Sequence, residues 1–173
     1  MLDSKHILIT GASSGIGAAL AFEYAAPGVT FSLLGRNAER LAHSASRASS
    51  RGATVVTHAG DVTDANSMAT WIAERNAALP LDLVIANAGI SGRTSRAEEL
   101  AEQAMSVFAV NVGGVFNTIH PVLPLMRERG RGQIAILSSL AGFIGLAGAA
   151  AYASSKAAVR VYGEALRAEM APP

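Results

Sequence analysis

The stretch that decides the fold is Thr10-Gly11-Ala12-Ser13-Ser14-Gly15-Ile16-Gly17, which joins the apolar run Ile7-Leu8-Ile9 to the alanine-rich run Ala18-Ala19-Leu20-Ala21. This order is typical of a strand, a tight turn and a helix. Gly11 lacks a Cβ and can take a turn conformation that other residues resist. Gly15 and Gly17 let the backbone approach a pyrophosphate closely, and the new helix offers free N–H groups to the phosphates. A glycine-rich turn without a ligand is the alternative, since short glycine patterns also occur by chance.

Strand and helix patterns alternate through the rest of the chain. We expect further strands at 29–34, 53–57, 81–86 and 133–137, and helices at 37–50, from 64 onward, at 97–129 and at 151–170. The long helix carries Pro121 and Pro124, so we expect a kink there. The apolar strand runs are typical of strands that are buried on both faces of a parallel sheet. The sequence therefore predicts an α/β fold with a doubly wound parallel sheet, whose ligand crevice lies at the carboxyl ends of the strands.

Composition narrows the class of protein. The 173 residues have a net charge of +1, and the basic residues are scattered along the sequence. This distribution gives no basic cluster of the kind that binds nucleic acid. No cysteine is present, and the four histidines show no metal-ligand spacing, so no metal site is expected. The weakly polar run Leu140 to Ala153 is too short and too rich in glycine to cross a bilayer. We expect a cytoplasmic protein of one domain that does not bind membranes.

The end of the second strand bears on the choice of nucleotide. An acidic residue there normally holds the ribose hydroxyls of the cofactor, but this chain has Arg36 after Gly35. A guanidinium can pair with a 2′-phosphate, so the sequence favours NADP(H) over NAD(H). Asp61-Val62 follows the third strand at the same edge, where the carboxylate could bind an adenine amino group. The alternatives are that Arg36 solvates a strand end and that Asp61 is an ordinary loop residue.

Tyr152 and Lys156 open the last predicted helix at a spacing of i and i+4, so both side chains can reach one site. A nearby ammonium favours the phenolate of a tyrosine, which suits the pair to proton exchange with a carbonyl or alcohol oxygen. Ser138 and Ser139 end the fifth strand, at the edge where a parallel α/β fold binds its ligands. Taken singly, the tyrosine and the lysine could be ordinary surface residues of a helix, and the two serines could belong to a turn.

Taken together, these motifs resemble the short-chain dehydrogenase/reductase family over nearly the whole chain. The resemblance rests on residues 10–17, Asn87-Ala88-Gly89, Asn111, Ser139 and Tyr152-x3-Lys156, in the order and approximate spacing of the family. It implies a Rossmann fold and an enzyme that interconverts a carbonyl and an alcohol with a nicotinamide cofactor, which carries the hard chemistry. The family usually has asparagine at position 86, where this chain has Ala86.

The resemblance also implies a role for each matching residue. Tyr152 is the general acid in reduction and the base in oxidation, and Lys156 lowers its pKa and binds the nicotinamide ribose. Ser139 polarises the carbonyl of the substrate, with Ser138 as the less favoured candidate. Asn111 holds a water molecule in the proton relay. From the residues and the resemblance together, the expected cofactor contacts are Gly11, Ser13, Ser14, Gly15, Ile16, Gly17, Arg36, Asp61, Val62, Asn87, Ala88, Gly89, Tyr152 and Lys156.

Family members extend beyond the tyrosine helix into two more strands and a segment that covers the substrate. We therefore expect residues 1–173 to form an incomplete Rossmann domain of five strands, with the fifth at a sheet edge. Three functions stay open: an NADP(H)-dependent oxidoreductase of small carbonyl or alcohol compounds, a non-catalytic dinucleotide-binding module, and a structural partner. The resemblance further implies a homodimer or homotetramer that pairs through the long fourth helix and the last helix.

Overall fold

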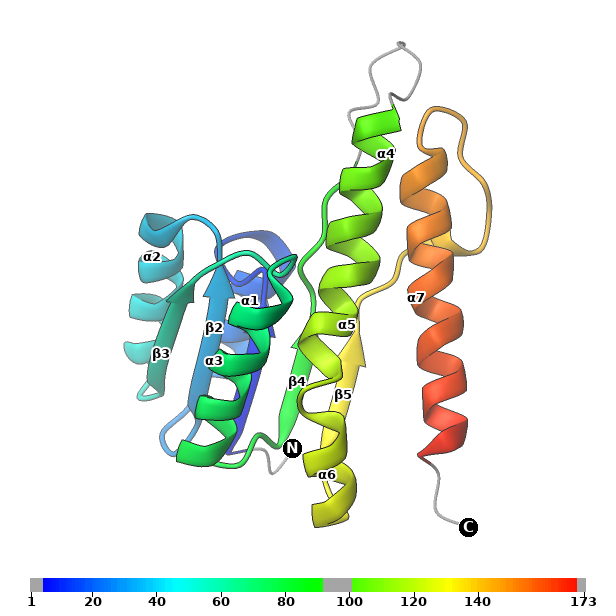
Figure 1. Cartoon of the computed structure of the whole chain (residues 1–173). Coiled ribbons are helices and arrows are strands. Elements are labelled where there is room, and N and C mark those ends of the chain that lie inside the picture. Colours follow the sequence, from blue (N-terminus) through cyan, green and yellow to red (C-terminus); the bar gives the residue numbers. More distant parts are fainter. Residues whose placement is uncertain (1–4, 92–100, 171–173) are drawn as a thin grey trace.

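A computed structural model describes residues 5–91 and 101–170 of the chain, and its centre is a parallel sheet of five strands (Figure 1). The strands lie in the order β3-β2-β1-β4-β5, so β5 occupies an edge as expected. Their bounds are β1 His6–Thr10, β2 Thr30–Gly35, β3 Thr54–Ala59, β4 Leu83–Ala86 and β5 Gln133–Ile136. The order reverses at β1, which pairs with both β2 and β4. The predicted doubly wound parallel fold is confirmed.

Helices connect the strands, and α2 and α3 begin directly after the cap residues that the sequence predicts. The helices are α1 Gly15–Glu23, α2 Ala38–Ser49, α3 Ala65–Ala78, α4 Ala101–Phe108, α5 Gly114–Ile119, α6 Leu123–Arg129 and α7 Ala150–Glu169, with the π-helical turn η1 Ala109–Gly113 and the 3₁₀ turn η2 Leu140–Gly142. Before α2, the Asn37 side chain accepts a hydrogen bond from the Arg40 N–H at 2.8 Å. Before α3, Asp64 accepts one from the Ser67 N–H at 3.0 Å. Each side-chain oxygen satisfies a free donor of the first turn.

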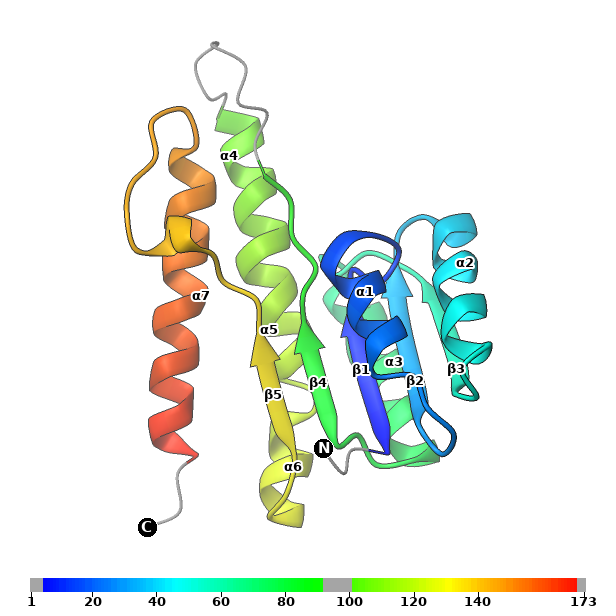
Figure 2. The ribbon, with the colours of Figure 1, turned by 180° about the vertical axis from the view of Figure 1, so that it is seen from behind.

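Helices pack on both faces of the central strands β1, β2 and β4, whereas the edge strands β3 and β5 are only partly buried, and none of the described helices lies over β5 on the side of α1 and α2 (Figures 1 and 2). On one face, α1 and α2 cover β1 and β2, and the core there includes Ile9, Phe31 and Leu41. On the other face, α3 and α6 cover β1 and β4 around Leu8 and Trp71. A third cluster joins α5 and α7 to the ends of β4 and β5. Because both faces of the central strands are covered, most of their residues are apolar, although His6, Thr10 and Ser32 are buried polar residues. The expected burial on both faces is wrong for the edge strands β3 and β5.

The long connection between β4 and β5 differs from the single kinked helix that the sequence predicts. The π-helical turn η1 joins α4 to α5, and the helix then breaks before α6, with Pro121 in the break and Pro124 in the first turn of α6. The expected start at residue 97 lies outside the described residues. By length and composition alone, the stretch 101–129 could cross a membrane. In the fold it packs on the sheet and on α7 and buries Val107, Val115 and Ile119, as a core helix does. The cytoplasmic location stays a prediction.

The two helical segments expected to pair with a second copy, α4–α5 and α7, lie side by side (Figures 1 and 2). They expose large apolar side chains, among them Met105, Phe108 and Val161. Such side chains are compatible with an interface. The pairing itself stays a prediction.

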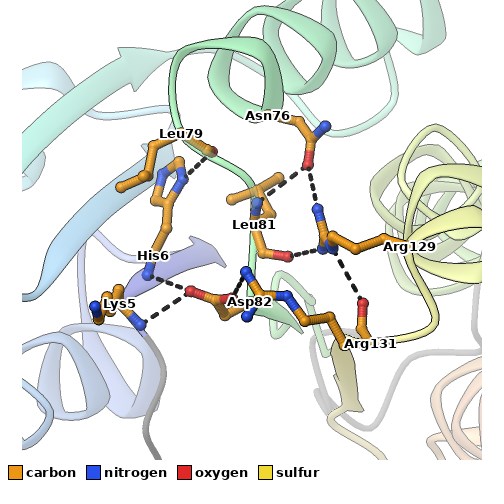
Figure 3. A network of polar contacts seen from close by, with 8 residues as sticks. All are labelled: Lys5, His6, Asn76, Leu79, Leu81, Asp82, Arg129 and Arg131. Carbon is orange, nitrogen blue, oxygen red and sulfur yellow. Dashed lines mark hydrogen bonds and ion pairs between the residues drawn. The ribbon is translucent and has the colours of Figure 1, made fainter.

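A polar network joins the amino ends of three strands, opposite the expected ligand crevice (Figure 3). The Asp82 carboxylate accepts hydrogen bonds from the backbone N–H groups of Lys5 and His6 at 3.0 and 3.1 Å. Arg131, just before β5, lies 3.9 Å from the same carboxylate. Arg129 donates to the carbonyl of Leu81. The network ties the start of β1 to the loops that precede β4 and β5.

His6 is the buried member of this network, with 2% of its surface exposed. Its Nδ1 lies 2.6 Å from the carbonyl oxygen of Leu79 and its Nε2 lies 2.9 Å from Ser32 Oγ. A carbonyl only accepts, so Nδ1 donates and the neutral ring receives the Ser32 hydroxyl proton at Nε2. Burial lowers the pKa of His6, and the charge of Arg75 lowers it further. The hydrogen bond to the Leu79 carbonyl and the charge of Asp82 act in the opposite direction, but burial is the largest effect. The folded chain therefore favours the neutral imidazole.

This burial makes stability depend on pH in the acid range. An unfolded histidine titrates near pH 6.5, so below that value the unfolded chain binds more protons at position 6 than the folded chain. We expect the free energy of unfolding to fall as the pH is lowered from 7 to 5, and the slope to flatten in His6→Gln. Chemical denaturation at a series of pH values between 5 and 7 measures the free energy of unfolding of both proteins. The exposed His43→Gln is the matched control, and an unchanged slope in His6→Gln would contradict the assignment.

Candidate functional site

A cleft of about 420 Å³ opens at the carboxyl ends of the strands, where the strand order reverses. Ligands of open α/β sheets bind at this place. The cleft is lined by Gly11, Ser13, Ser14, Gly15, Ile16, Leu34, Gly35, Arg36, Asn37, Arg40, Gly60, Asp61, Val62, Asn87, Ala88, Gly89, Ile90, Ser91, Val110, Leu137, Ser138, Tyr152 and Lys156. All predicted cofactor contacts except the buried Gly17 are among these residues. A wider groove of about 880 Å³ between α1 and α2 shares Ser13 to Gly15 but is lined by neither Tyr152 nor Lys156.

Two positions of the glycine turn, Gly11 and Gly17, are packed so closely that no side chain fits there. Gly11 and Gly15 have positive φ angles of 68° and 54°, which L-residues rarely adopt. A Cβ on Gly17 would lie 2.5 Å from the carbonyl oxygen of Gly11 and 2.6 Å from the Nδ2 of Asn87. The Asn87 amide donates to the carbonyls of Thr10 and Gly11 at 2.8 and 3.3 Å. These contacts lock the turn onto the residue that follows β4.

The start of α1 suits an anionic ligand. Ser14 is the N-cap residue of α1, in extended conformation, but its side chain caps none of the helix N–H groups. The first turn of the helix holds no acidic side chain. Free N–H groups and the positive end of the helix dipole therefore face the cleft at the glycine turn. A dinucleotide pyrophosphate fits this arrangement.

The far end of the cleft, at β2 and β3, contains the residues that the sequence linked to the nucleotide. Arg36 and Asp61 are partly exposed, and their nearest charged atoms are 4.0 Å apart. The Oδ1 of Asp61 already accepts hydrogen bonds from the N–H and the hydroxyl of Thr63, both at 2.9 Å. The side chain of Arg36 is 65% exposed and its guanidinium is held by a weak ion pair, so it can turn to a phosphate.

Tyr152 and Lys156 meet at the opposite end, on the first turns of α7. The Lys156 Nζ lies 6.0 Å from the centre of the Tyr152 ring and donates to the carbonyl of Leu137 at 2.8 Å. Lys156 is buried, and burial lowers the pKa of its ammonium. A Cβ on Gly89 would lie 3.3 Å from this Nζ, so glycine at position 89 leaves room for the lysine.

Asn111 lies behind the cleft wall, in η1, and is fully buried. Its Oδ1 accepts from the Ile90 N–H at 2.8 Å, and its Nδ2 donates to the Ile90 carbonyl at 2.9 Å. The Nδ2 also donates to Ser155 Oγ at 3.0 Å. The side chain is thus held by protein groups, and the expected water in the relay would have to be held by the backbone of this turn.

The two serines after β5 have different surroundings. Ser138 lines the cleft, and its hydroxyl donates to the Lys156 carbonyl at 2.8 Å. Ser139, the favoured candidate, lies beside the cleft-lining residues, and its Oγ accepts from the Ala141 N–H at 3.2 Å as it caps η2. Both side chains are half-buried. The structure places Ser139 near the cleft without assigning it a role.

Sequence reasoning missed several lining residues. Asn37 and Arg40 follow Arg36 at the start of α2, and Ile90 and Ser91 extend the wall after Gly89. Arg40 could have been found from the sequence, because it is a second arginine only four residues after Arg36, at the start of the predicted helix. Leu137 was missed as well; it directly follows β5, and strand ends of a parallel sheet share one edge.

The comparisons with known proteins agree with this geometry. The family model described as short chain dehydrogenase matches residues 5–173. An uncharacterized oxidoreductase from Myxococcus xanthus is 42% identical over 167 residues, which cover 96% of this chain and 66% of that protein. A short chain dehydrogenase from Mycobacterium paratuberculosis bound to NAD has a TM-score of 0.88 at 28% identity, covering 96% of this chain and 67% of that one. A metagenomic short-chain oxidoreductase in complex with NADP has a TM-score of 0.88 at 27% identity, covering 96% and 76%.

The chain belongs to the short-chain dehydrogenase family. It spans between half and two thirds of the length of two curated relatives that it matches. The resemblance inferred from the motifs is confirmed at the level of the family and of its Rossmann fold.

The close contact at Gly17 gives a test of the glycine turn. Gly17→Ala would push a methyl group against the Gly11 carbonyl and the Asn87 amide, and overpacking of this kind costs about 1–3 kcal/mol. We expect a lower melting temperature and weaker nucleotide binding, measured by thermal denaturation and by titration. Gly145→Ala is the matched control, since a Cβ there meets nothing within 4 Å. Equal stability of the two variants would contradict the packing argument.

Proposed function

We propose that this chain is the nucleotide-binding and catalytic part of an NADP(H)-dependent oxidoreductase that interconverts a carbonyl and an alcohol. The main observation behind this proposal is that Tyr152 and Lys156 line the same cleft as the glycine turn. Membership of the short-chain dehydrogenase family supports it, and relatives of known structure hold NAD or NADP. The cofactor would supply the hydride chemistry, and the side chains of the chain would bind, orient and move the proton.

At the reaction end, the Tyr152 hydroxyl would give its proton to the carbonyl oxygen in reduction and take it back in oxidation. The Lys156 ammonium stabilises the resulting phenolate by its charge, at 6.0 Å from the ring centre. Its hydrogen bond to the Leu137 carbonyl fixes the Nζ beside the ring. Ser139 would polarise the substrate oxygen, and the backbone of the Asn111 turn would hold the water that relays the proton.

The proton transfer predicts a specific defect in Tyr152→Phe. The variant keeps the ring but loses the transferable proton, so we expect kcat to fall about 10²- to 10⁴-fold while the Kd for NADPH changes less than about twofold. Steady-state kinetics over a panel of ketones and aldehydes, with NADPH titration by fluorescence, measures both. Tyr24→Phe is the control, because Tyr24 ends α1 outside the cleft.

If Tyr152→Phe keeps most of the activity, Tyr152 has no part in the mechanism. Saturable NADPH binding by the wild type without turnover of any carbonyl or alcohol would instead support the non-catalytic module.

The nucleotide preference rests on Arg36. Arg36→Ala removes the guanidinium that would pair with the 2′-phosphate, and hydrogen bonds to charged groups are worth about 1.5–3 kcal/mol. We expect NADPH to bind about 10-fold more weakly or worse, and NADH to bind nearly as before. Arg47→Ala is the matched control, because Arg47 of α2 stacks over Phe22 of α1, outside the cleft. Equal losses for both nucleotides would contradict the 2′-phosphate assignment.

A further inference from the structure

We propose that Ser155 is a positioning residue that couples Asn111 to the helical turn carrying Tyr152. This inference rests on the proposed oxidoreductase function and adds to it a residue outside the cleft. Ser155 is fully buried on α7, and its hydroxyl bridges two segments. It accepts a hydrogen bond from the Nδ2 of Asn111 at 3.0 Å and donates one to the carbonyl of Tyr152 at 2.8 Å.

The direction of each hydrogen bond follows from the chemistry of the groups. The backbone N–H of Ile90 can only donate, so the atom of Asn111 that faces it is the amide oxygen. The other amide atom is then the nitrogen, which donates both to the Ile90 carbonyl and to Ser155 Oγ. The single proton of the serine hydroxyl is left for the Tyr152 carbonyl. The amide of Asn111 has a partner for its oxygen and for both protons.

The hydrogen bonds form a continuous chain from the cleft wall to the tyrosine. Ile90 follows β4 and lines the cleft, Asn111 lies in the π-helical turn η1, and Ser155 lies one turn of α7 after Tyr152. The serine hydroxyl therefore sets where the first turn of α7 lies relative to η1 and to the wall at Ile90. Small displacements of a reacting group reduce catalysis steeply, because an error of about 1 Å can cost about 100-fold in rate.

The neighbouring serine shows that this bridge is not a general property of the helix. Ser154 is exposed, and its hydroxyl donates to the carbonyls of Ala150 and Ala151 within α7. Loss of that hydroxyl leaves the packing between α7 and η1 unchanged. Loss of the Ser155 hydroxyl leaves one proton of the buried Asn111 amide without an acceptor. The Asn111 side chain must then shift, or that proton stays unpaired.

The test compares wild type, Ser155→Ala, Ser155→Thr and Ser154→Ala with a carbonyl compound that the wild type reduces. We expect Ser155→Ala to lower kcat about 10- to 100-fold while the KM for NADPH changes less than about twofold. Ser155→Thr keeps a hydroxyl and should recover most of kcat, and Ser154→Ala should match the wild type. If Ser155 had only a structural role, Ser155→Ala would lower the melting temperature without lowering kcat at a nearly unchanged KM.

A second readout does not depend on turnover. The side-chain amide of Asn111 gives ¹⁵N–¹H signals, which we expect to shift and to exchange faster with water in Ser155→Ala but not in Ser154→Ala. Unchanged amide signals, or a kcat of Ser155→Ala within about twofold of wild type, would overturn the proposal. If the wild type reduces no carbonyl compound, the proposed function fails, and the amide signals still decide whether Ser155 holds Asn111.

Discussion

The close contact between the glycine turn and the residue after β4 is the constraint on which the site depends. Strand β1, helix α1 and the end of β4 meet where Gly17 faces the Gly11 carbonyl and the Asn87 amide. No side chain fits in this space, so the helix begins directly against the strand. The same contact places the free N–H groups of α1 at the mouth of the cleft. One packing requirement thus builds both the fold and the surface that we propose to bind the phosphates.

The two ends of the cleft are held by different kinds of interaction. At the end proposed to hold the nucleotide, Arg36 and Asp61 are partly exposed, and their weak ion pair leaves the guanidinium free to move. At the reaction end, Lys156, Asn111 and Ser155 are buried and held by hydrogen bonds to the backbone. An exposed charge suits the recognition of a mobile phosphate, whereas a buried and satisfied network suits a reacting group that has to keep its position.

The amino ends of the strands carry a separate network that has no part in the cleft. Asp82 joins β1 to the loop before β4, and Arg131 reaches the same carboxylate from the loop before β5 (Figure 3). This division follows from the parallel sheet, because all strand ends of one kind lie at the same edge. Residues that stabilise the sheet gather at one edge and the residues of the candidate site at the other.

The sequence by itself determined the fold class, the glycine turn, the helix caps at Asn37 and Asp64, and the residues that line most of the cleft. These features are local, since each depends on a strand, turn or cap whose signal lies within a few neighbouring residues. Only the tertiary structure decided how Asn111 is used, because its partners Ile90 and Ser155 lie 21 and 44 residues away along the chain. The same holds for the π-helical turn and for His6, whose burial between Leu79 and Ser32 depends on the assembled sheet. Contacts between distant segments leave no periodic signal, and only packing brings them together.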